Sequence, residues 1–467
     1  MAYSDYPEDQ DIIIYGATGD LAQHRLWPAL YNLYPQQLPQ HGVLLGTSLD
    51  DISLTEFINL VRSWVKHTVA VWDEAKFPLF AQKISYSAAT ALNNRHSPNS
   101  HRLIYLSIPA SAFGGALSAI KSLGLEQNAK IVIEKPFGHD LNSAQSLNNL
   151  LHQVVDEERI YRIDHYLGKE AVQNLLMLRF GNSMLQHLWN RQAVESVQIT
   201  VAEDEGVEHR GHIYEESGAI RDVVQNHMMQ LLALTCMTPP ATWEPESIRD
   251  EKVKVLRAIQ PISPQDVVLG QYGAGTVKGQ PVPGYLNVFG VNPDSKVETY
   301  AALKCYVGTW DWAGIPFYLR TGKALCVKRT EIILQFRDVP LRLFSEDGHA
   351  TSNRLTVRIQ PDEGISLSFN VKTPGDKLLQ HPAKMDFKYD EIFDRHRPEA
   401  YERLIHDVLI NDHTLFIRED ETEAAWSALS PLLLDMPTPH IYPAGGYGPE
   451  AADAICKWHE LGHHTNR

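Results

Sequence analysis

Cysteine, net positive charge and long apolar runs are all scarce in this sequence. Its 467 residues include only four cysteines: Cys236, Cys305, Cys326 and Cys456. None of them has C-x-x-C spacing, so we expect reduced thiols rather than a disulfide framework or a thiolate metal site. No apolar run is long enough to span a membrane, and the acidic start "MAYSDYPEDQD" lacks the features of a secretory signal. We therefore predict a cytoplasmic protein.

The net charge of −15 also restricts the partners that we expect. Nucleic acids and anionic membranes are bound through clustered cations, so we predict binding to neither. A small anionic ligand would need a local pocket of positive charge.

The first third of the chain alternates short apolar runs with amphipathic segments. The runs typical of strands are residues 11–16 (DIIIYG), 42–48, 102–109, 130–136 and 159–164. Between them, residues 53–68 begin with Ser53 and Glu56 at capping-box spacing and place their apolar residues on one face. Strands that alternate with helices predict a parallel, doubly wound, Rossmann-like sheet. We assign this α/β domain to residues 1–164.

The pattern changes after about residue 165, where helical segments are followed by strands with alternating apolar and polar residues. In residues 365–372 (ISLSFNVK), the apolar side chains share one face. A period of two favours a mostly antiparallel sheet with unlike faces. We therefore predict a larger α+β domain over residues 165–467. Residues 271–287 are rich in glycine and proline and are predicted to form a long surface loop.

A glycine turn follows the first predicted strand. Gly16, Gly19 and Ala22 are spaced three apart, and small residues there let backbone amides approach a pyrophosphate at a helix N-terminus. Alone, such a turn is often only a connection, but its place in an alternating fold favours a dinucleotide. The end of the second strand offers Asp50 and Asp51 for ribose hydroxyls and no arginine for a 2′-phosphate. An equally good explanation is that both aspartates only precede the Ser53 helix cap.

Five motifs follow one another along the chain: GATGDLA (16–22), IEKPFG (133–138), RIDHYLGKE (162–170), RDVVQNH (221–227) and PFYLRTGK (316–323). In this order they resemble the motifs of glucose-6-phosphate dehydrogenases. The third is highly specific to that family, and the similarity continues to YPAGGYGPEAADA (442–454), so it covers nearly the whole chain. The resemblance implies oxidation of glucose 6-phosphate at C1 to 6-phosphogluconolactone in the pentose phosphate pathway of glucose metabolism. The hydride would pass to NAD or NADP, and no metal is expected.

The resemblance assigns the chemical step to two residues. His227 corresponds to the family's general base, and Asp164 to the carboxylate that orients this base and stabilises its charged form. From the residues alone, His227 would be a histidine of the core, because its helix is largely apolar. In the same way, each polar residue of the binding set would by itself be an exposed charge or part of a surface salt bridge.

The resemblance also implies ligands for the substrate and the coenzyme. The phosphate would be held by His165, Tyr166 and Lys169, with Lys323 and Lys328 near the phosphate and sugar. The sugar hydroxyls would be bound by Glu203, Asp222 and Gln360, and Lys135 would lie between sugar and coenzyme. The coenzyme would contact Gly16, Ala17, Thr18, Gly19, Asp20, Leu21, Arg25, Leu49, Asp50 and Lys135. The sequence leaves open whether the bond from Lys135 to Pro136 is cis.

Two departures from the family bear on the coenzyme. The usual basic triplet after GDLA is here Gln23, His24 and Arg25, so only the last cation is firmly kept. Leu49 stands where members that use NADP usually carry an arginine. A lost charge-assisted contact is worth roughly 1.5 to 3 kcal/mol, so we expect a preference for NAD, or dual use.

The resemblance further implies a homodimer, or a dimer of dimers, formed through the large sheet. Some animal members bind a second, structural NADP near this sheet. We predict that this site is absent, because the basic residues for it are sparse, with Glu331 and Ile333 following Arg329.

Three alternative functions stay open. The HELGH segment, His459 to His463, matches a zinc-peptidase pattern, but it contains a glycine and is expected by chance in roughly one such protein in twenty. The pair His209 and His212 is read as a loop feature. A non-catalytic relative that binds a sugar phosphate is disfavoured, because both catalytic residues are kept. A dehydrogenase of another aldose 6-phosphate is the nearest alternative.

Overall fold

The computed structural model describes residues 10–89, 101–341, 343–344, 351–393 and 399–459. The chain divides into two compact units. Unit 1 comprises Met1–Lys169, Ala241–Arg249 and Arg397–Glu423, and unit 2 comprises Glu170–Pro240, Asp250–His396 and Ala424–Arg467.

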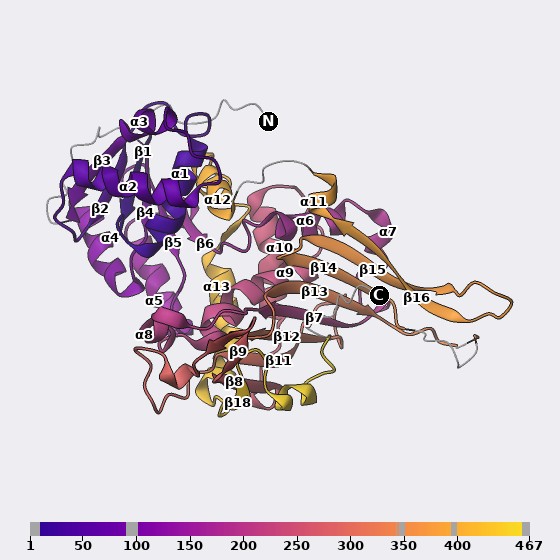
Figure 1. Ribbon diagram of the computed structural model, residues 1–467. Helices are drawn as coiled ribbons and strands as arrows, with labels where there is room; N and C mark the ends of the chain where they lie inside the picture. Colours follow the sequence, from indigo (N-terminus) through magenta and orange to yellow (C-terminus); the bar gives the residue numbers. More distant parts are fainter. Residues whose placement is uncertain (1–9, 90–100, 342, 345–350, 394–398, 460–467) are drawn as a thin grey trace. The chain divides into compact units, whose positions relative to one another are not determined.

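Unit 1 contains a sheet that, in the described part of the chain, has seven strands in the order β3-β2-β1-β4-β5-β6-β17 (Figure 1). The strands are β1 (Gln10–Tyr15), β2 (Leu44–Ser48), β3 (Ile84–Ala88), β4 (His101–Leu106), β5 (Ala129–Glu134), β6 (Ile160–Ile163) and β17 (Phe416–Ile417). Strands β1 to β6 are parallel, and β17 pairs antiparallel with β6. This order reverses direction between β1 and β4, so the predicted doubly wound sheet is confirmed.

Helices connect these strands in unit 1. They are η1 (Ala22–Leu26), α1 (Trp27–Leu33), α2 (Leu54–Thr68), α3 (Lys76–Ala81), η3 (Ala110–Ala112), α4 (Phe113–Ser122), α5 (Leu141–His152), η4 (Glu157–Arg159) and α12 (Ala400–Leu409). The side chain of Ser53 accepts a hydrogen bond from the backbone N–H of Glu56, which confirms the predicted start of α2. A helix start can be read from sequence in this way because the cap satisfies backbone donors locally.

Each of the five predicted strands of the first third is present, but β3 and β17 were missed. Unit 1 also extends beyond the single segment that was predicted for the first domain, since it includes residues 241–249 and 397–423. Strand β17 shows the reason. It pairs with β6 across more than 250 residues of sequence, and no local pattern reports such a pairing.

Unit 2 contains a sheet that has nine strands among the described residues, in the order β16-β15-β14-β13-β7-β12-β11-β8-β18 (Figure 1). They are β7 (Val194–Ala202), β8 (Val267–Gly273), β11 (Tyr300–Tyr306), β12 (Pro316–Gly322), β13 (Arg329–Phe336), β14 (Arg354–Gln360), β15 (Gly364–Lys372), β16 (Gln380–Lys388) and β18 (His440–Pro443). Strand β7 pairs with β12, and β8 with β18, in parallel, and the other neighbours are antiparallel. The predicted α+β fold with a mostly antiparallel sheet is confirmed.

The remaining elements complete the chain. Unit 2 includes α6 (Glu170–Phe180), α7 (Ser183–Gln186), η5 (Glu208–Arg210), α8 (Gly211–Tyr214), the π-helix η6 (Ile220–Met228), α9 (Met229–Cys236), η7 (Pro264–Asp266), β9 (Gly275–Val277), β10 (Gln280–Val282), η8 (Tyr285–Asn287), α11 (Tyr389–Ile392) and η9 (Glu450–Ala454). Helices α10 (Pro245–Ala258) and α13 (Glu419–Leu434) contain residues of both units. Among the described residues, no helix combines the length and the apolar composition needed to cross a membrane.

One local prediction in unit 2 was wrong, and one strand has an unexpected pattern of burial. Residues 271–287 are not one long loop: Gln271 and Tyr272 are buried in β8, and β9 and β10 form a short antiparallel pair. In β15 the polar face is the better buried one. Ser366 is buried there beside Arg358, whose guanidinium binds Asp386 at 2.8 Å, whereas the apolar Ile365 and Leu367 are half-buried. An ion pair can occupy a buried face when its polar atoms are satisfied, and alternation alone does not show this.

Candidate active site

The glycine turn after β1 folds as a tight connection in unit 1. Gly16 has φ of +77°, and a Cβ atom there would lie 2.1 Å from the carbonyl oxygen of Ser107, so only glycine fits. The N–H groups of Gly16 and Ala17 donate to the carbonyl of Thr47 at 2.8 and 3.1 Å. The N–H of Gly19 donates to the carbonyl of Gly16 at 2.9 Å. The turn thus places a segment of backbone without bulky side chains at the carboxyl end of β1. This is the edge at which open α/β sheets bind ligands.

Asp50 is held in a network of hydroxyls at the ends of β2 and β3. Its carboxylate accepts from the hydroxyl of Thr18 at 2.5 Å and from that of Ser48 at 3.2 Å. The hydroxyl of Tyr86 donates to the carbonyl of Asp50 at 2.6 Å. Leu49, beside it, is 92% exposed. The Asp50 carboxylate is therefore oriented by its neighbours, while Leu49 has room for a larger side chain.

Lys135 follows β5 directly after the half-buried Glu134. The hydroxyl of Tyr105 donates to the Oε1 atom of Glu134 at 2.5 Å, and Tyr401 also forms a hydrogen bond with this carboxyl. Burial raises the pKa of Glu134 to about 7, although the two tyrosines and Lys135 lower it. The peptide bond from Lys135 to Pro136 is cis.

The segment after β6 places three polar side chains in a short turn. The carboxylate of Asp164, which is 1% exposed, accepts a hydrogen bond from the backbone N–H of Tyr166 at 2.9 Å. The ammonium group of Lys169 lies 4.0 Å from the centre of the Tyr166 ring. Gly168 allows a close approach to α12, since a Cβ atom there would lie 3.0 Å from the carbonyl oxygen of Ala400. The turn therefore presents a histidine, a phenol and an ammonium group within five residues.

Unit 2 gathers a second set of predicted ligands at the ends of β7 and β12. The ammonium of Lys323, which is largely buried, pairs with the carboxylate of Glu203 and lies 3.9 Å from that of Asp222. The ring of Tyr214 lies 5.4 Å from the same ammonium. Two carboxylates around one lysine form a cluster of donors and acceptors that suits a polyhydroxylated ligand.

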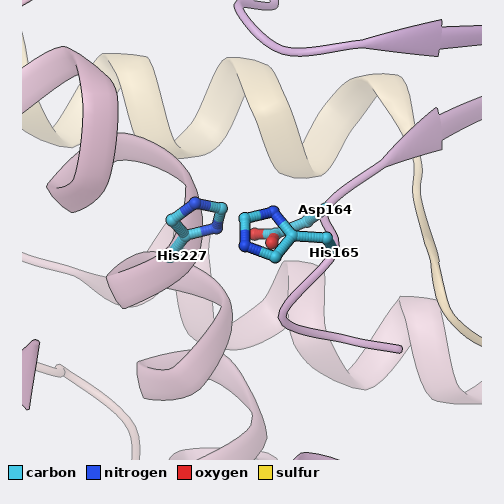
Figure 2. A group of neighbouring side chains, drawn as sticks. All are labelled: Asp164, His165 and His227. Carbon is cyan, nitrogen blue, oxygen red and sulfur yellow. The ribbon is translucent and has the colours of Figure 1, made fainter. Parts of the chain in front are cut away.

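His227 lies on the π-helix η6, downstream of Asp222 on the same segment. It is 3% exposed, and its backbone N–H donates to the side-chain oxygen of Asn226 at 2.6 Å. Figure 2 shows the imidazole on this helix, and Asp164 and His165 on the segment that follows β6. π-Helical turns are uncommon and occur frequently at functional sites.

Three further predicted residues lie in more exposed surroundings. Lys328 is 3.4 Å from the carboxylate of Glu205, and Arg25 is 3.5 Å from that of Glu399. Gln360 ends β14 and is half-buried.

Comparison with known proteins identifies the family. Two family models match consecutive parts of the chain: "Glucose-6-phosphate dehydrogenase, NAD binding domain" over residues 13–174, and "Glucose-6-phosphate dehydrogenase, C-terminal domain" over residues 176–464. The chain belongs to the glucose-6-phosphate dehydrogenase family. The glucose-6-phosphate 1-dehydrogenase of Bacillus subtilis (strain 168) is 40% identical, with 95% of this chain and 96% of that protein covered. The one from Chlamydia muridarum is 39% identical, with 95% and 94% covered.

Solved structures agree with this assignment. The crystal structure of glucose-6-phosphate 1-dehydrogenase from Mycobacterium avium has a TM-score of 0.86 at 37% identity and covers 96% of this chain and 97% of its own. A glucose-6-phosphate dehydrogenase in complex with its substrate glucose-6-phosphate has a TM-score of 0.88 at 37% identity, with 97% and 98% covered. The family predicted from the five motifs is confirmed.

Sequence reasoning missed several residues that support these clusters. The hydroxyl of Tyr86 and the carboxyls of Glu134 and Glu298 carry no motif of their own, although Glu134 lies inside the IEKPFG segment. The expectation of few basic residues near the large sheet was also incomplete, because strands β12, β13 and β14 bring four arginines around Glu331: Arg320, Arg329, Arg354 and Arg358. The absence of a structural NADP there stays a prediction.

The rival zinc pattern is only partly covered by the structure. In the HELGH segment, His459 is described, and its Nδ1 atom lies 3.0 Å from the guanidinium of Arg354, while residues 460–463 lie outside the described residues. His209 and His212 occupy η5 and α8 and are exposed.

Proposed function

We propose that the protein oxidises D-glucose 6-phosphate at C1 to 6-phospho-D-glucono-1,5-lactone, with NAD or NADP as the hydride acceptor. The proton of the C1 hydroxyl goes to the imidazole of His227, and the hydrogen on C1 leaves as hydride to the nicotinamide. The electron pair of the O–H bond then forms the carbonyl of the lactone. The observation that carries the proposal is the retention of His227, Asp164 and the Lys323 cluster in a chain whose relatives carry this activity in their names.

Asp164 is proposed to orient His227 and to stabilise its imidazolium form. One oxygen of its carboxylate accepts a hydrogen bond from the backbone N–H of Tyr166, so the orientation of the carboxylate is fixed. A paired carboxylate raises the basicity of an imidazole, and general-base catalysis of this kind contributes typically 10²- to 10⁴-fold. No metal takes part in this proposal.

The substrate phosphate is assigned to His165, Tyr166 and Lys169. The cation–π contact between Lys169 and Tyr166 holds the ammonium close to the phenol, so the two groups can bind one dianion together. Glu203, Asp222 and Lys323 are assigned to the sugar hydroxyls, with Gln360, Lys328 and Lys135 as further ligands. A dehydrogenase of another aldose 6-phosphate would use the same phosphate ligands, so the sugar hydroxyls decide between the two.

A preference for NAD over NADP is the finer part of the proposal. Asp50, oriented by Thr18 and Ser48, can accept hydrogen bonds from ribose hydroxyls, and its negative charge repels a 2′-phosphate. Arg25 is the arginine among the predicted coenzyme ligands, and Glu399 lies 3.5 Å from it.

The experiment that tests the function is the rate of reduced-nicotinamide formation by the purified protein. Glucose 6-phosphate, 2-deoxyglucose 6-phosphate and glucosamine 6-phosphate should be compared, each with NAD and with NADP. The proposal predicts the largest kcat/KM for glucose 6-phosphate with NAD. A larger kcat/KM with another sugar phosphate would identify that compound as the substrate. A larger kcat/KM with NADP would change only the proposed coenzyme. Binding without turnover would indicate a non-catalytic relative.

A homodimer formed through the large sheet is proposed as well. The face of β15 and β16 that carries Ile365, Leu367, Phe387 and Met385 is apolar, and Met385 is 58% exposed. Exposed apolar residues that gather on one sheet face are typical of an interface between subunits.

A further inference from the structure

The first turn of the helix that carries Asp222 and His227 is tied to a buried carboxylate from another part of unit 2. Glu298 lies just before β11 and is 3% exposed. Its Oε1 atom accepts a hydrogen bond from the backbone N–H of Ile220 at 3.0 Å, and its carbonyl oxygen accepts one from Ala219 at 2.9 Å. The first N–H groups of a helix have no partner within the helix, so these two bonds fix the start of η6.

The chain before this helix is shaped to admit the carboxylate. Gly218 has φ of +68°, which favours glycine. A Cβ atom at Gly218 would lie 2.5 Å from Oε1 of Glu298 and 2.7 Å from Oε2. Any larger residue would therefore displace the carboxylate from the helix start.

The residue after Glu298 fixes the backbone of Lys323. The carbonyl oxygen of Thr299 accepts a hydrogen bond from the N–H of Lys323 at 2.9 Å. The hydroxyl of Tyr442 donates to the carbonyl of Lys323 at 2.7 Å and lies 3.1 Å from the hydroxyl of Thr299. Two consecutive residues thus hold the main chains that bear Asp222, His227 and Lys323.

We propose that Glu298 is a positioning residue for the reaction: it holds the start of η6, and through it the sugar ligand Asp222 and the general base His227. This inference rests on the proposed function and deepens it. Glu298 acts through the backbone of the helix and has no contact with the substrate.

The raised pKa of Glu298 indicates that its carboxylate does not stabilise the folded state. Burial raises the pKa of Glu298 to about 7, although the N–H of Ile220 and the charge of Arg221 lower it. The other titratable groups that face it are Tyr214 and Tyr285. An acid with a raised pKa in the folded state opposes folding increasingly as pH rises from its ordinary value of 4.5 through about 7. A neutral glutamine, which keeps an acceptor oxygen, should therefore fold at least as well at neutral pH.

The test compares Glu298→Ala with Glu298→Gln, and uses Glu331→Ala as the matched control. Glu331 is also a buried carboxyl of unit 2 with a raised pKa, but it lies on β13. Glu298→Ala should lower kcat on the order of ten- to a hundredfold, because a small misplacement of catalytic groups is costly, and should leave KM for the coenzyme within about twofold. Glu298→Gln should recover kcat to within about threefold of wild type. The control should change the melting temperature but not kcat.

Hydrogen exchange of the backbone separates this proposal from the proposed function. In Glu298→Ala, exchange should become faster in peptides that cover residues 219–228, and Glu298→Gln should keep the protection of wild type. This readout applies even if the wild type shows no turnover, an outcome that would defeat the proposed reaction alone. Unchanged exchange in Glu298→Ala, or a kcat within twofold of wild type, would overturn the role of Glu298. An equal loss of kcat in both Glu298 variants would also overturn it.

Discussion

Tyr105 donates a hydrogen bond of 2.5 Å to the half-buried carboxyl of Glu134, the residue that precedes Lys135. Burial raises the pKa of Glu134 from 4.5 to about 7. The folded protein then binds a proton more tightly than the unfolded chain does, so Glu134 lowers stability progressively as pH rises from about 4.5 through 7.

Replacing Glu134 with Gln should therefore stabilise the protein relative to wild type above pH 7, by up to about 3 kcal/mol, and change little at pH 5. Urea unfolding at several pH values measures this difference. Tyr105→Phe is the matched control: it removes a donor to the carboxylate, so it should steepen the loss of stability with pH. A difference between Glu134→Gln and wild type that does not change with pH would contradict the raised pKa.

The general base is tested by replacing His227 with Asn. The substitution should lower kcat at least about a hundredfold, because asparagine cannot take the proton of the C1 hydroxyl, and should leave the binding of glucose 6-phosphate within a few-fold. Turnover assays and calorimetric titration measure the two effects. His440→Asn, at an exposed histidine of β18, should behave as wild type. Near-normal turnover of His227→Asn would remove this residue from the mechanism.

Elements with a local physical cause were readable from the sequence, whereas contacts across the sheets were not. Ser53 indicates the start of α2, because its hydroxyl accepts a hydrogen bond from the N–H of a residue only three positions away. The alternation in 365–372 gave β15 to within one residue. The pairing of β17 with β6 and the anchoring of Ile220 by Glu298 depend on residues far apart in the chain. A spacing rule cannot report them.

The candidate site follows the same division. Motifs pointed to Asp164, Lys169, His227 and Lys323, because each of them stands in a contiguous segment that resembles the family; the roles of these residues stay predictions. The hydrogen-bonded carboxyls of Glu134 and Glu298 belong to no recognisable residue spacing, since many sequences can supply an acceptor for a neighbouring donor. Their roles become visible only when burial and hydrogen bonds are known.

If Lys169 binds the substrate phosphate, Lys169→Ala should weaken the binding of glucose 6-phosphate selectively. Removing the ammonium should raise KM for glucose 6-phosphate roughly ten- to a hundredfold, since a charge-assisted contact is worth about 1.5 to 3 kcal/mol. Any turnover of unphosphorylated glucose at high concentration should change much less, which separates a phosphate contact from general damage to the enzyme. Lys372→Ala, at an exposed lysine of β15, is the control. Equal losses with glucose and glucose 6-phosphate would contradict the assignment.

The proposed dimer predicts an effect of charge on the apolar face of the large sheet. Leu367→Asp should shift the protein toward monomer, because Leu367 faces Met385 of the neighbouring strand and an interface would bury the new carboxylate. Sedimentation equilibrium over a range of concentrations measures the shift. Leu79→Asp, at an exposed leucine of α3, should not alter the assembly. A wild type that is monomeric at all concentrations would contradict the proposal.

The proposed preference for NAD is assigned to Leu49 and Asp50. Leu49 is 92% exposed, so Leu49→Arg should fold normally and place a guanidinium beside the ribose site. A new charge-assisted contact with a 2′-phosphate should raise the ratio of kcat/KM for NADP to that for NAD at least about tenfold. Leu49→Gln, which adds length without charge, should change the ratio little. Steady-state kinetics with both coenzymes measure this ratio.

If Leu49→Arg leaves the ratio unchanged, position 49 does not contact the 2′-phosphate, and the preference must be sought at Arg25 or Thr18. If the wild type already favours NADP, the carboxylate of Asp50, held by Thr18 and Ser48, does not exclude the phosphate.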